Sequence, residues 1–403
     1  MEDLNLPLEG LVVLEMSGLA PVPYCGLILA DFGATVIRVD RVVGDSIVSQ
    51  PIDQLTRGKH SIAINLKHKE GVEVLRSLAK KADVLIDSYR PGVMEKLGLS
   101  PESLMSEAPR LIYARLTGFG QTGPYALRAG HDINYIALSG ALSVLGRRGQ
   151  APLFPSNILG DFASGGMMCA LGIMFALYER KSTGRGKLID SSMMDGAAYL
   201  ATFIYKLRVG RTGWWDNDRG CNALDSGAHF YEVYETLDHK YISVGAIEGP
   251  FYSELLKGMG LAERTDLPDQ TDQTQWPRMK QLFKEIFAKK TRDEWEQIFM
   301  GTDACVAPVL EMHELTGHPQ ATARQLVFKG DNGLDVMMAP RLFDVQNTTK
   351  LSIQQQQQQQ IDQLSTKKLV VEGANTVTVL KKFGFESDDI DRLIESKNMN
   401  RTC

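Results

Sequence analysis

The first 120 residues alternate between short runs of apolar, mostly β-branched residues and segments with the spacing of amphipathic helices. The runs that predict strands are residues 11–18, 34–40, 60–66, 82–89 and 110–120. The segments with helical spacing include residues 24–34 and 70–82. Strands that alternate with helices form a parallel sheet with helices on both faces. The sequence therefore predicts an α/β fold whose large domain contains a Rossmann-like parallel sheet.

The size and composition of the chain are those of a globular protein with more than one domain. It has 403 residues, of which 43% are hydrophobic and 23% charged, and one domain ordinarily takes about 100–200 residues. A net charge of −5, without a dense block of Lys and Arg, argues against a nucleic-acid partner. The five scattered cysteines have no CxxC spacing, which predicts a reducing compartment and no metal site.

Composition shifts divide the rest of the chain. Residues 208–228 are polar and rich in glycine, which predicts a linker between a large domain (1–207) and a small α+β domain (229–325). The remaining segment, 326–403, carries helical patterns and an uninterrupted glutamine run at 354–360. We expect this run to be a solvated loop insertion.

The sequence predicts no membrane span and no readable targeting signal. The acidic N-terminus resembles neither a signal peptide nor a transit peptide, and the C-terminal NRTC is neither a peroxisomal tripeptide nor a prenylation box. No apolar run reaches the roughly 18 residues that a membrane span needs. Residues 161–187 read as one long apolar helix with a basic end, which we expect to be buried at the centre of the fold.

The turn after the first predicted strand argues against a dinucleotide cofactor. Residues 17–26 contain two prolines and lack GxGxxG, so the glycines that let a backbone approach a pyrophosphate are missing. NAD and FAD are therefore not expected.

Three acidic or basic positions are candidates for acid–base chemistry. His131 lies between a glycine and Asp132, and an imidazole, with an ordinary pKa of about 6.5, can give or take a proton near neutrality; a lone histidine is also often structural. Asp161 opens the long apolar helix, either as an N-cap or facing a ligand, because the small residues 163–166 would leave that helix end and its N–H groups accessible. Glu248 ends a predicted strand, where acidic residues are common.

Basic and aromatic residues follow the predicted strands. Carboxyl ends of parallel strands meet at one edge of a sheet, and Arg41 and Lys67 lie at two such ends. Phosphate groups and an aromatic base could be held there by Tyr89, Arg90 and Lys96, with Arg38, Arg57 and Lys59 as possible substitutes. Met193 and Met194 would offer an adaptable apolar surface or simply pack in the core.

Seven motifs carry a family resemblance: MSGLAPVPYCGLILADFGATVIRVDR, TRGKHSIAINLK, YRPGVMEKLGL, LIYARLTGFGQTGP, AGHDINYIALSG, LGDFASGGMMCALGI and ISVGAIEGPFY. Together they resemble the α-methylacyl-CoA racemases within the family III CoA-transferase (CaiB/BaiF) superfamily. The resemblance implies a large domain completed by residues 326–403, a small domain, and an interlocked homodimer with its active site between domains. It also implies an acyl-CoA substrate, no cofactor, a role in branched fatty-acid or bile-acid metabolism, and a peroxisomal or mitochondrial location; without it, a cytoplasmic location is expected.

The resemblance also implies roles for single residues. His131 and Asp161 would be the acid/base pair on opposite faces of the substrate α-carbon, Glu248 would orient the histidine, and Asp132 would be a supporting acid. The N–H groups near Asp161 could stabilise an enolate oxygen. The expected CoA- and substrate-binding positions are Arg41, Ile64, Asn65, Leu66, Lys67, Tyr89, Arg90, Lys96 and Gly130.

Two other functions stay open. A family III CoA-transferase would use Asp161 as a nucleophile, and a catalytically silent acyl-CoA-binding protein would need only the basic residues. By the resemblance, transferases lack the histidine of GHDINY, so His131 favours the racemase.

Overall fold

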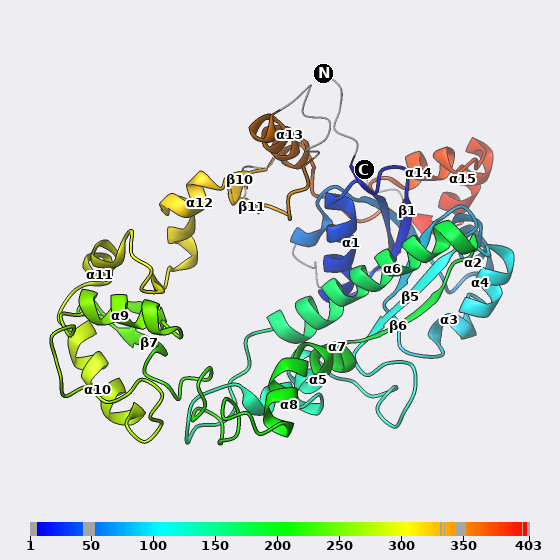
Figure 1. Ribbon diagram of the computed structural model, residues 1–403. Coiled ribbons are helices and arrows are strands. Elements are labelled where there is room, and N and C mark those ends of the chain that lie inside the picture. The colour runs from blue at the N-terminus through cyan, green and yellow to red at the C-terminus, as the bar shows by residue number, and fades with distance from the viewer. Residues whose placement is uncertain are drawn as a thin grey trace. The chain divides into compact units, whose positions relative to one another are not determined.

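The computed structural model describes residues 6–42, 53–330, 333, 335–343, 352–396 and 398–400. The chain divides into two compact units (Figure 1). The first comprises 1–139, 156–199 and 320–403, and the second comprises 140–155 and 200–319. Residues 320–403 belong to the first unit, and residues 140–155, which we expected in the large domain, belong to the second unit.

The first unit is built on a sheet of seven strands in the order β12-β3-β2-β1-β4-β5-β6. Six of them are parallel, in the 3-2-1-4-5-6 order of a Rossmann fold. The seventh, β12, pairs antiparallel with β3. This confirms the predicted α/β fold. The strands are β1 (Val12–Met16), β2 (Thr35–Arg41), β3 (His60–Ile64), β4 (Val84–Asp87), β5 (Ile112–Thr117), β6 (Leu188–Ser192) and β12 (Met399–Asn400).

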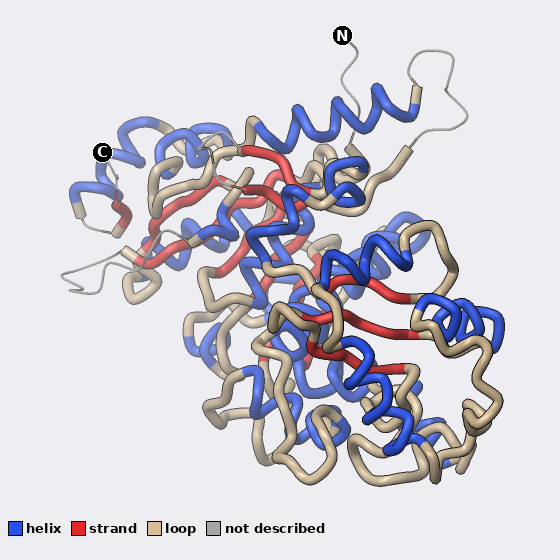
Figure 2. The backbone as a smooth tube through the Cα atoms, turned by 90° about the vertical axis from the view of Figure 1, so that its left-hand side faces the viewer, coloured by secondary structure: helices blue, strands red, loops and turns tan. Residues whose placement is uncertain are grey.

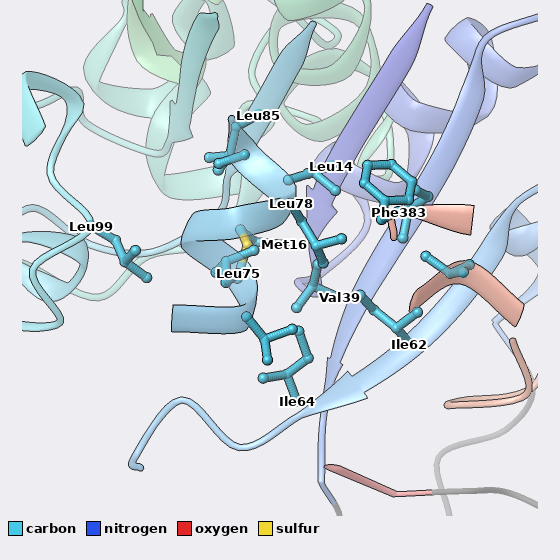
Figure 3. Close-up of a cluster of buried hydrophobic side chains, with 14 of the residues drawn as sticks. Leu14, Met16, Val39, Ile62, Ile64, Leu75, Leu78, Leu85, Leu99 and Phe383 are labelled. Atoms are coloured by element: carbon cyan, nitrogen blue, oxygen red, sulfur yellow. The ribbon is translucent and has the colours of Figure 1, made fainter. Parts of the chain in front are cut away.

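Apolar side chains on the two faces of this sheet form two separate cores, because successive residues of a strand point to opposite faces. One core contains Leu14, Ile62, Leu75, Leu78 and Phe383, which Figure 3 shows between the strands and the helices that cover them. The helices on this side include α2 (Lys69–Ala79), α14 (Thr376–Lys382) and α15 (Ser387–Glu395). The other core belongs to α1 (Pro21–Asp31) and α6 (Met168–Thr183).

The second unit has a three-stranded antiparallel sheet, whose strands are red in Figure 2 like those of the large sheet. Aromatic rings dominate its core, with Phe283, Phe287 and Trp295 packed edge to face. Its strands are β7 (Tyr231–Glu235), β8 (Tyr241–Gly245) and β9 (Val306–Pro308), and its helices include α8 (Thr202–Val209), α9 (Gly249–Gly258), α10 (Trp276–Phe287) and α11 (Arg292–Phe299).

The glycine-rich segment 208–228 is not the predicted linker but a structured part of the second unit. The Asp225 carboxylate accepts the backbone N–H groups of Gly220 and Asn222, both at 2.7 Å. The buried Asn222 side chain donates to the Asp218 carbonyl at 3.0 Å. The prediction was wrong because glycine and polar residues also serve to close tight turns with side-chain hydrogen bonds.

The glutamine run is not a loop: it lies in the helix α13 (Ile353–Ser365), shown in Figure 1. Glutamine has a good helix propensity, and a capping box at Ser352 starts the helix, because Ser352 and Gln355 each accept the other's backbone N–H. Gln356 and Gln360 are buried, and Gln360 donates to the Leu342 carbonyl at 2.6 Å. Low complexity therefore did not prevent this segment from packing.

The long apolar helix begins earlier than predicted and is not fully buried. Residues Ile158–Met167 form a π-helix that continues into α6. The apolar residues Met167, Leu171, Met174, Phe175 and Tyr178 recur at helical spacing on one exposed face, which we call the outer face of α6. The opposite face, with Cys169, Ile173, Ala176 and Leu177, packs in the core.

Residues 158–183 form a helix that is long and apolar enough to cross a membrane by length and composition. The expectation that no apolar stretch reaches about 18 residues is therefore wrong. The inner face of α6 nevertheless packs on α1, β5 and β6, and the core helix of a soluble protein passes the same test. Composition alone is weak evidence for a membrane span.

Candidate active site

His131 precedes the first turn of α5 (Asp132–Leu138), after the long connection that follows β5. Its side chain is exposed. Asp132, the next residue, is buried, at 4% exposure. The change from an exposed histidine to a buried aspartate gives these two neighbouring side chains different surroundings.

Asp161 is held in place by Asp132. Its backbone N–H donates to Asp132 Oδ2 at 2.7 Å. Gly160 makes this contact possible, because a Cβ atom there would lie only 2.5 Å from the same oxygen. Asp161 lies inside the first turn of the π-helix, whose N-cap is Asn157, so the N-cap interpretation of Asp161 was wrong. Its N–H is also occupied and is not the enolate-stabilising donor that the sequence suggested.

Opposing effects act on the pKa of the Asp161 carboxyl group. Burial raises its pKa above the ordinary value, and the nearby charge of Asp132 raises it further. A hydrogen bond from Asn157 Nδ2, at 3.2 Å to Asp161 Oδ2, and the charge of His131 act in the opposite direction. The structure thus brings His131, Asp132 and Asp161 into one electrostatic neighbourhood, with an Asp161 carboxyl that takes up a proton more readily than a solvated aspartate.

The small residues after Asp161 serve packing. A Cβ atom at Gly165 would lie 3.0 Å from Pro21 Cβ, and one at Gly166 would lie 2.8 Å from the Pro21 carbonyl oxygen. These glycines therefore let α1 approach the π-helix, and the expectation that they leave the helix end open to a ligand is wrong. Tight packing here fixes the turn that carries Asp161.

The predicted binding residues gather at the carboxyl edge of the sheet. Arg41 is the last residue of β2, and its guanidinium lies 5.8 Å from the centre of the Tyr89 ring, which follows β4. Arg90 reaches the Leu127 carbonyl at 3.4 Å, and its charge acts on Tyr135, as do the charges of Asp161 and Asp132. Gly130 directly precedes His131. A strip of cationic and aromatic side chains thus runs from β2 to the neighbourhood of Asp161.

Residues 64–67 continue this edge where β3 ends. The side chain of Ile64 is in the core, and Leu66 packs against it, so these two can offer only backbone groups or a partly covered surface. Asn65 Oδ1 accepts the Lys67 N–H at 3.1 Å and so closes a turn. Lys67 lies in this turn and is exposed. Lys96 is the exposed last residue of α3 (Val93–Lys96).

The suggested substitutes for the phosphate-binding cations are buried ion-pair partners. Each faces a carboxylate: Arg38 pairs with Asp40 at 2.8 Å, Arg57 with Asp31 at 2.7 Å and Lys59 with Glu15 at 2.7 Å. A cation that neutralises a buried carboxylate is not available to a phosphate. The sequence showed the charges but not the partners that occupy them.

The methionine pair was also misplaced as a ligand surface. Met193 is buried and packs near Gly165 in the core, with Met194 against the same core. The core alternative is therefore correct for this pair. Two exposed methionines, Met167 and Met174, lie on the outer face of α6.

Glu248 belongs to the second unit. It follows β8, occupies the N-cap position of α9 and is exposed, but its side chain makes no capping hydrogen bond. Its charge acts on the neighbouring Cys305. The Glu248 carboxylate therefore does not cap a helix of the second unit. Within the described residues, no cluster of His, Cys, Asp and Glu suited to a metal ion is present.

One residue of this site was missed in the sequence. Asn157 lies four positions before Asp161, and residues four apart on a helix face one another. That spacing was a usable signal once the helix was known to begin near Ile158.

Comparison with known proteins places the chain in a family. The model of CoA-transferase family III matches residues 8–357. The mouse alpha-methylacyl-CoA racemase is 47% identical over 399 residues, which cover 97% of this chain and 98% of the mouse protein. Its human namesake is 46% identical over 98% of this chain and 99% of its own.

More distant relatives agree. The human succinyl-CoA:glutarate CoA-transferase is 30% identical over 80% of this chain and 76% of its own. A CAIB/BAIF family protein from Brucella suis has the same fold, with a TM-score of 0.76 at 24% identity over 94% of this chain and 100% of its own. The chain belongs to CoA-transferase family III.

Proposed function

We propose that the protein is a racemase that inverts the α-carbon of 2-methyl-branched acyl-CoA thioesters in branched fatty-acid or bile-acid metabolism. Near-full-length identity of 46–47% to two proteins named alpha-methylacyl-CoA racemase supports the substrate class. The observation that carries the chemistry is the 2.7 Å hydrogen bond from the Asp161 N–H to Asp132 Oδ2, which holds the Asp161 turn against the residue that follows His131.

Inversion removes the α-hydrogen from one face and adds a proton to the other. In one direction neutral His131 takes the proton, the C–H electron pair moves into the enolate, and protonated Asp161 returns a proton to the opposite face. In the other direction ionised Asp161 is the base and protonated His131 the acid. A raised Asp161 pKa serves this exchange, because both of its forms must be accessible. Proton transfer between side chains uses no cofactor, and CoA enters only as part of the substrate.

The enolate oxygen needs donors other than the occupied Asp161 N–H. The first N–H groups of a helix have no acceptor within it, and in α5 these belong to Asp132 and Ile133, directly after His131. We propose that they stabilise the oxyanion beside the imidazole; one such donor typically contributes about 10²–10³ in rate.

The CoA moiety would lie along the carboxyl edge of the sheet. Arg41, Lys67, Arg90 and Lys96 supply positive charge for its phosphates, and Tyr89 supplies a ring for adenine. The turn formed by residues 64–67 would add backbone contacts. This assignment explains why these cations are exposed while Arg38, Arg57 and Lys59 are paired.

We further propose that the protein is a homodimer in which Glu248 orients His131. The outer face of α6 is an apolar stripe on a long helix, and water contact of such a stripe is unfavourable. A second copy of the chain is the occupant we propose, as the family resemblance implies. The Glu248 carboxylate is exposed and makes no capping hydrogen bond to α9, so it can orient an imidazole. We propose that the enzyme acts in peroxisomes or mitochondria, where branched acyl-CoA thioesters are oxidised.

A CoA-transferase is the second candidate, because the family model and the 30% identical glutarate CoA-transferase carry that name. It would use the Asp161 carboxylate to attack the thioester carbonyl and release CoA. Incubation of one enantiomer of a 2-methylacyl-CoA in D₂O, with and without a dicarboxylic acid, separates the two. Loss of optical activity with α-deuterium uptake and no acceptor supports the racemase, and movement of CoA to the acid supports the transferase.

A further inference from the structure

The peptide bond between Gly130 and His131 is held at both of its polar groups by side chains of α5. Its N–H, which belongs to His131, donates to Asn134 Oδ1 at 3.0 Å. Its carbonyl, which belongs to Gly130, accepts a hydrogen bond from the Tyr135 hydroxyl. We infer that Asn134 and Tyr135 are positioning residues that fix His131 for proton transfer, an inference that rests on the proposed function.

Tyr135 can reach this carbonyl only because two glycines make room for its ring. A Cβ atom at Gly118 would lie 2.1 Å from the ring, and one at Gly130 would lie 2.8 Å from it. Phe119 supports the ring edge to face, with centroids 4.9 Å apart. The hydroxyl is thus carried by a ring that is packed against Phe119 and buried, at 8% exposure of the residue.

Asn134 completes the arrangement from the exposed side. Its own N–H donates to the His131 carbonyl at 2.8 Å, while its side chain accepts the His131 N–H. Both backbone groups of His131 are therefore bonded to the first turn of α5. With its backbone held in this way, the imidazole can move only by rotation about the side-chain torsions of His131.

Such a clamp matters because proton transfer requires the reacting atoms to lie about 3–3.5 Å apart, and a misplacement of about 1 Å can cost on the order of 10²-fold in rate. The Asp161 turn is held by the Asp132 carboxylate and the π-helix, whereas the hydrogen bonds of the clamp are made by the side chains of Asn134 and Tyr135. Loss of the clamp should therefore damage proton transfer on the His131 face of the substrate and spare transfer on the Asp161 face.

The test compares Tyr135→Phe and Asn134→Ala with wild type. Tyr135→Phe keeps the ring and removes one hydroxyl, and Asn134 is exposed, so both variants should fold. Asn134→Asp keeps the accepting oxygen and is the conservative variant. Tyr113→Phe is the matched control, because it removes a buried hydroxyl that donates to the Leu99 carbonyl at 3.2 Å, in the core.

Two rates are measured in D₂O for the enantiomer whose α-hydrogen faces Asp161: α-deuterium uptake and inversion. Inversion needs His131 to return a proton, whereas uptake with retention needs only Asp161. Inversion should fall about 3- to 10-fold in Tyr135→Phe and Asn134→Ala, the value of a typical hydrogen bond, while uptake changes little and KM is unchanged. The ratio of uptake to inversion rises. Asn134→Asp and Tyr113→Phe should keep a ratio close to that of wild type.

The inference is overturned if the wild-type enzyme racemises but the ratio of uptake to inversion is unchanged in both Tyr135→Phe and Asn134→Ala. This holds whether the two rates stay constant or fall together. Failure of the wild-type protein to invert the substrate, or inversion by His131→Ala at the wild-type rate, contradicts the proposed function instead. The two failures are therefore distinguishable in one set of experiments.

Discussion

The carboxylate of Asp132 accepts the backbone N–H of Asp161 at 2.7 Å, across 29 positions of the chain. This contact joins the residue after His131 to the turn that carries Asp161, the second proposed acid/base residue. A carboxylate at the start of a helix also interacts favourably with the helix dipole. Asp132 therefore acts on Asp161 in two ways, through the position of its backbone and through the pKa of its side chain.

Asp132→Asn should shift the pH dependence of the reaction to lower pH. The amide keeps an accepting oxygen for the Asp161 N–H but removes the charge that raises the Asp161 pKa. For the enantiomer whose α-hydrogen faces Asp161, Asp161 must be ionised, so the acid limb of the kcat/KM profile reports its pKa. That limb should move down in pH, with CoA affinity unchanged. An acid limb that stays in place would mean that Asp132 does not influence Asp161.

Asn157→Ala should move the same limb in the opposite direction. The Asn157 hydrogen bond stabilises the ionised carboxylate and lowers the Asp161 pKa, so its removal raises the pKa and shifts the limb to higher pH. Asn157 is exposed, and circular dichroism should show an unchanged fold. A shift of the same sign in both variants contradicts the assignment of opposite effects to these two neighbours.

Phe175→Glu should weaken the proposed homodimer. Phe175 is 64% exposed on the outer face of α6, and a charge placed in a covered apolar stripe must lose its hydration. Analytical ultracentrifugation should show dimers for wild type and monomers for the variant at micromolar concentration. Met312→Glu, at an 87% exposed position of the second unit, is the control and should remain dimeric. If the wild-type protein is a monomer, the proposal that a second copy of the chain covers the outer face of α6 is wrong.

Lys59→Met and Arg41→Met should separate stability from substrate binding. Lys59 and Glu15 are both fully buried and pair at 2.7 Å, and loss of one partner of a buried pair typically lowers the free energy of unfolding by about 3–5 kcal/mol. Arg41 is exposed, so its replacement should leave the unfolding curve unchanged and raise KM for the CoA thioester. Urea unfolding and initial-rate kinetics measure the two effects. A large increase in KM with unchanged stability for Lys59→Met would mean that Lys59 binds the substrate and does not stabilise the fold.

The sheet could be predicted because its evidence is local. Strands β1, β2, β4 and β5 are buried on both faces, so an apolar run such as 34–40 in the sequence becomes β2 with little ambiguity. Strand β6 is partly exposed and was not predicted. Segment 354–360 could not be read in this way. Its helix depends on a cap at Ser352 and on the burial of Gln356 and Gln360 by other parts of the chain.

The residue types of the candidate site could be recognised in the sequence, but their contacts could not. A histidine beside an aspartate can be recognised in the sequence, yet the capture of the Asp161 N–H by Asp132 is a tertiary contact. The same limit applies to Gly165, which could equally admit a ligand or a neighbouring helix, and to Lys59, whose charge gave no sign of Glu15. Local sequence shows which groups are present, and only the fold shows which of them are already paired.

The central claim is that His131 and Asp161 act on opposite faces of one α-carbon. The most direct measurement is α-deuterium uptake from each enantiomer, in separate incubations in D₂O, with His131→Gln and Asp161→Asn. His131→Gln should label only the enantiomer whose hydrogen faces Asp161, Asp161→Asn should label only the other, and neither should invert the centre. Uptake from the same enantiomer in both variants, or inversion by either, would contradict the account.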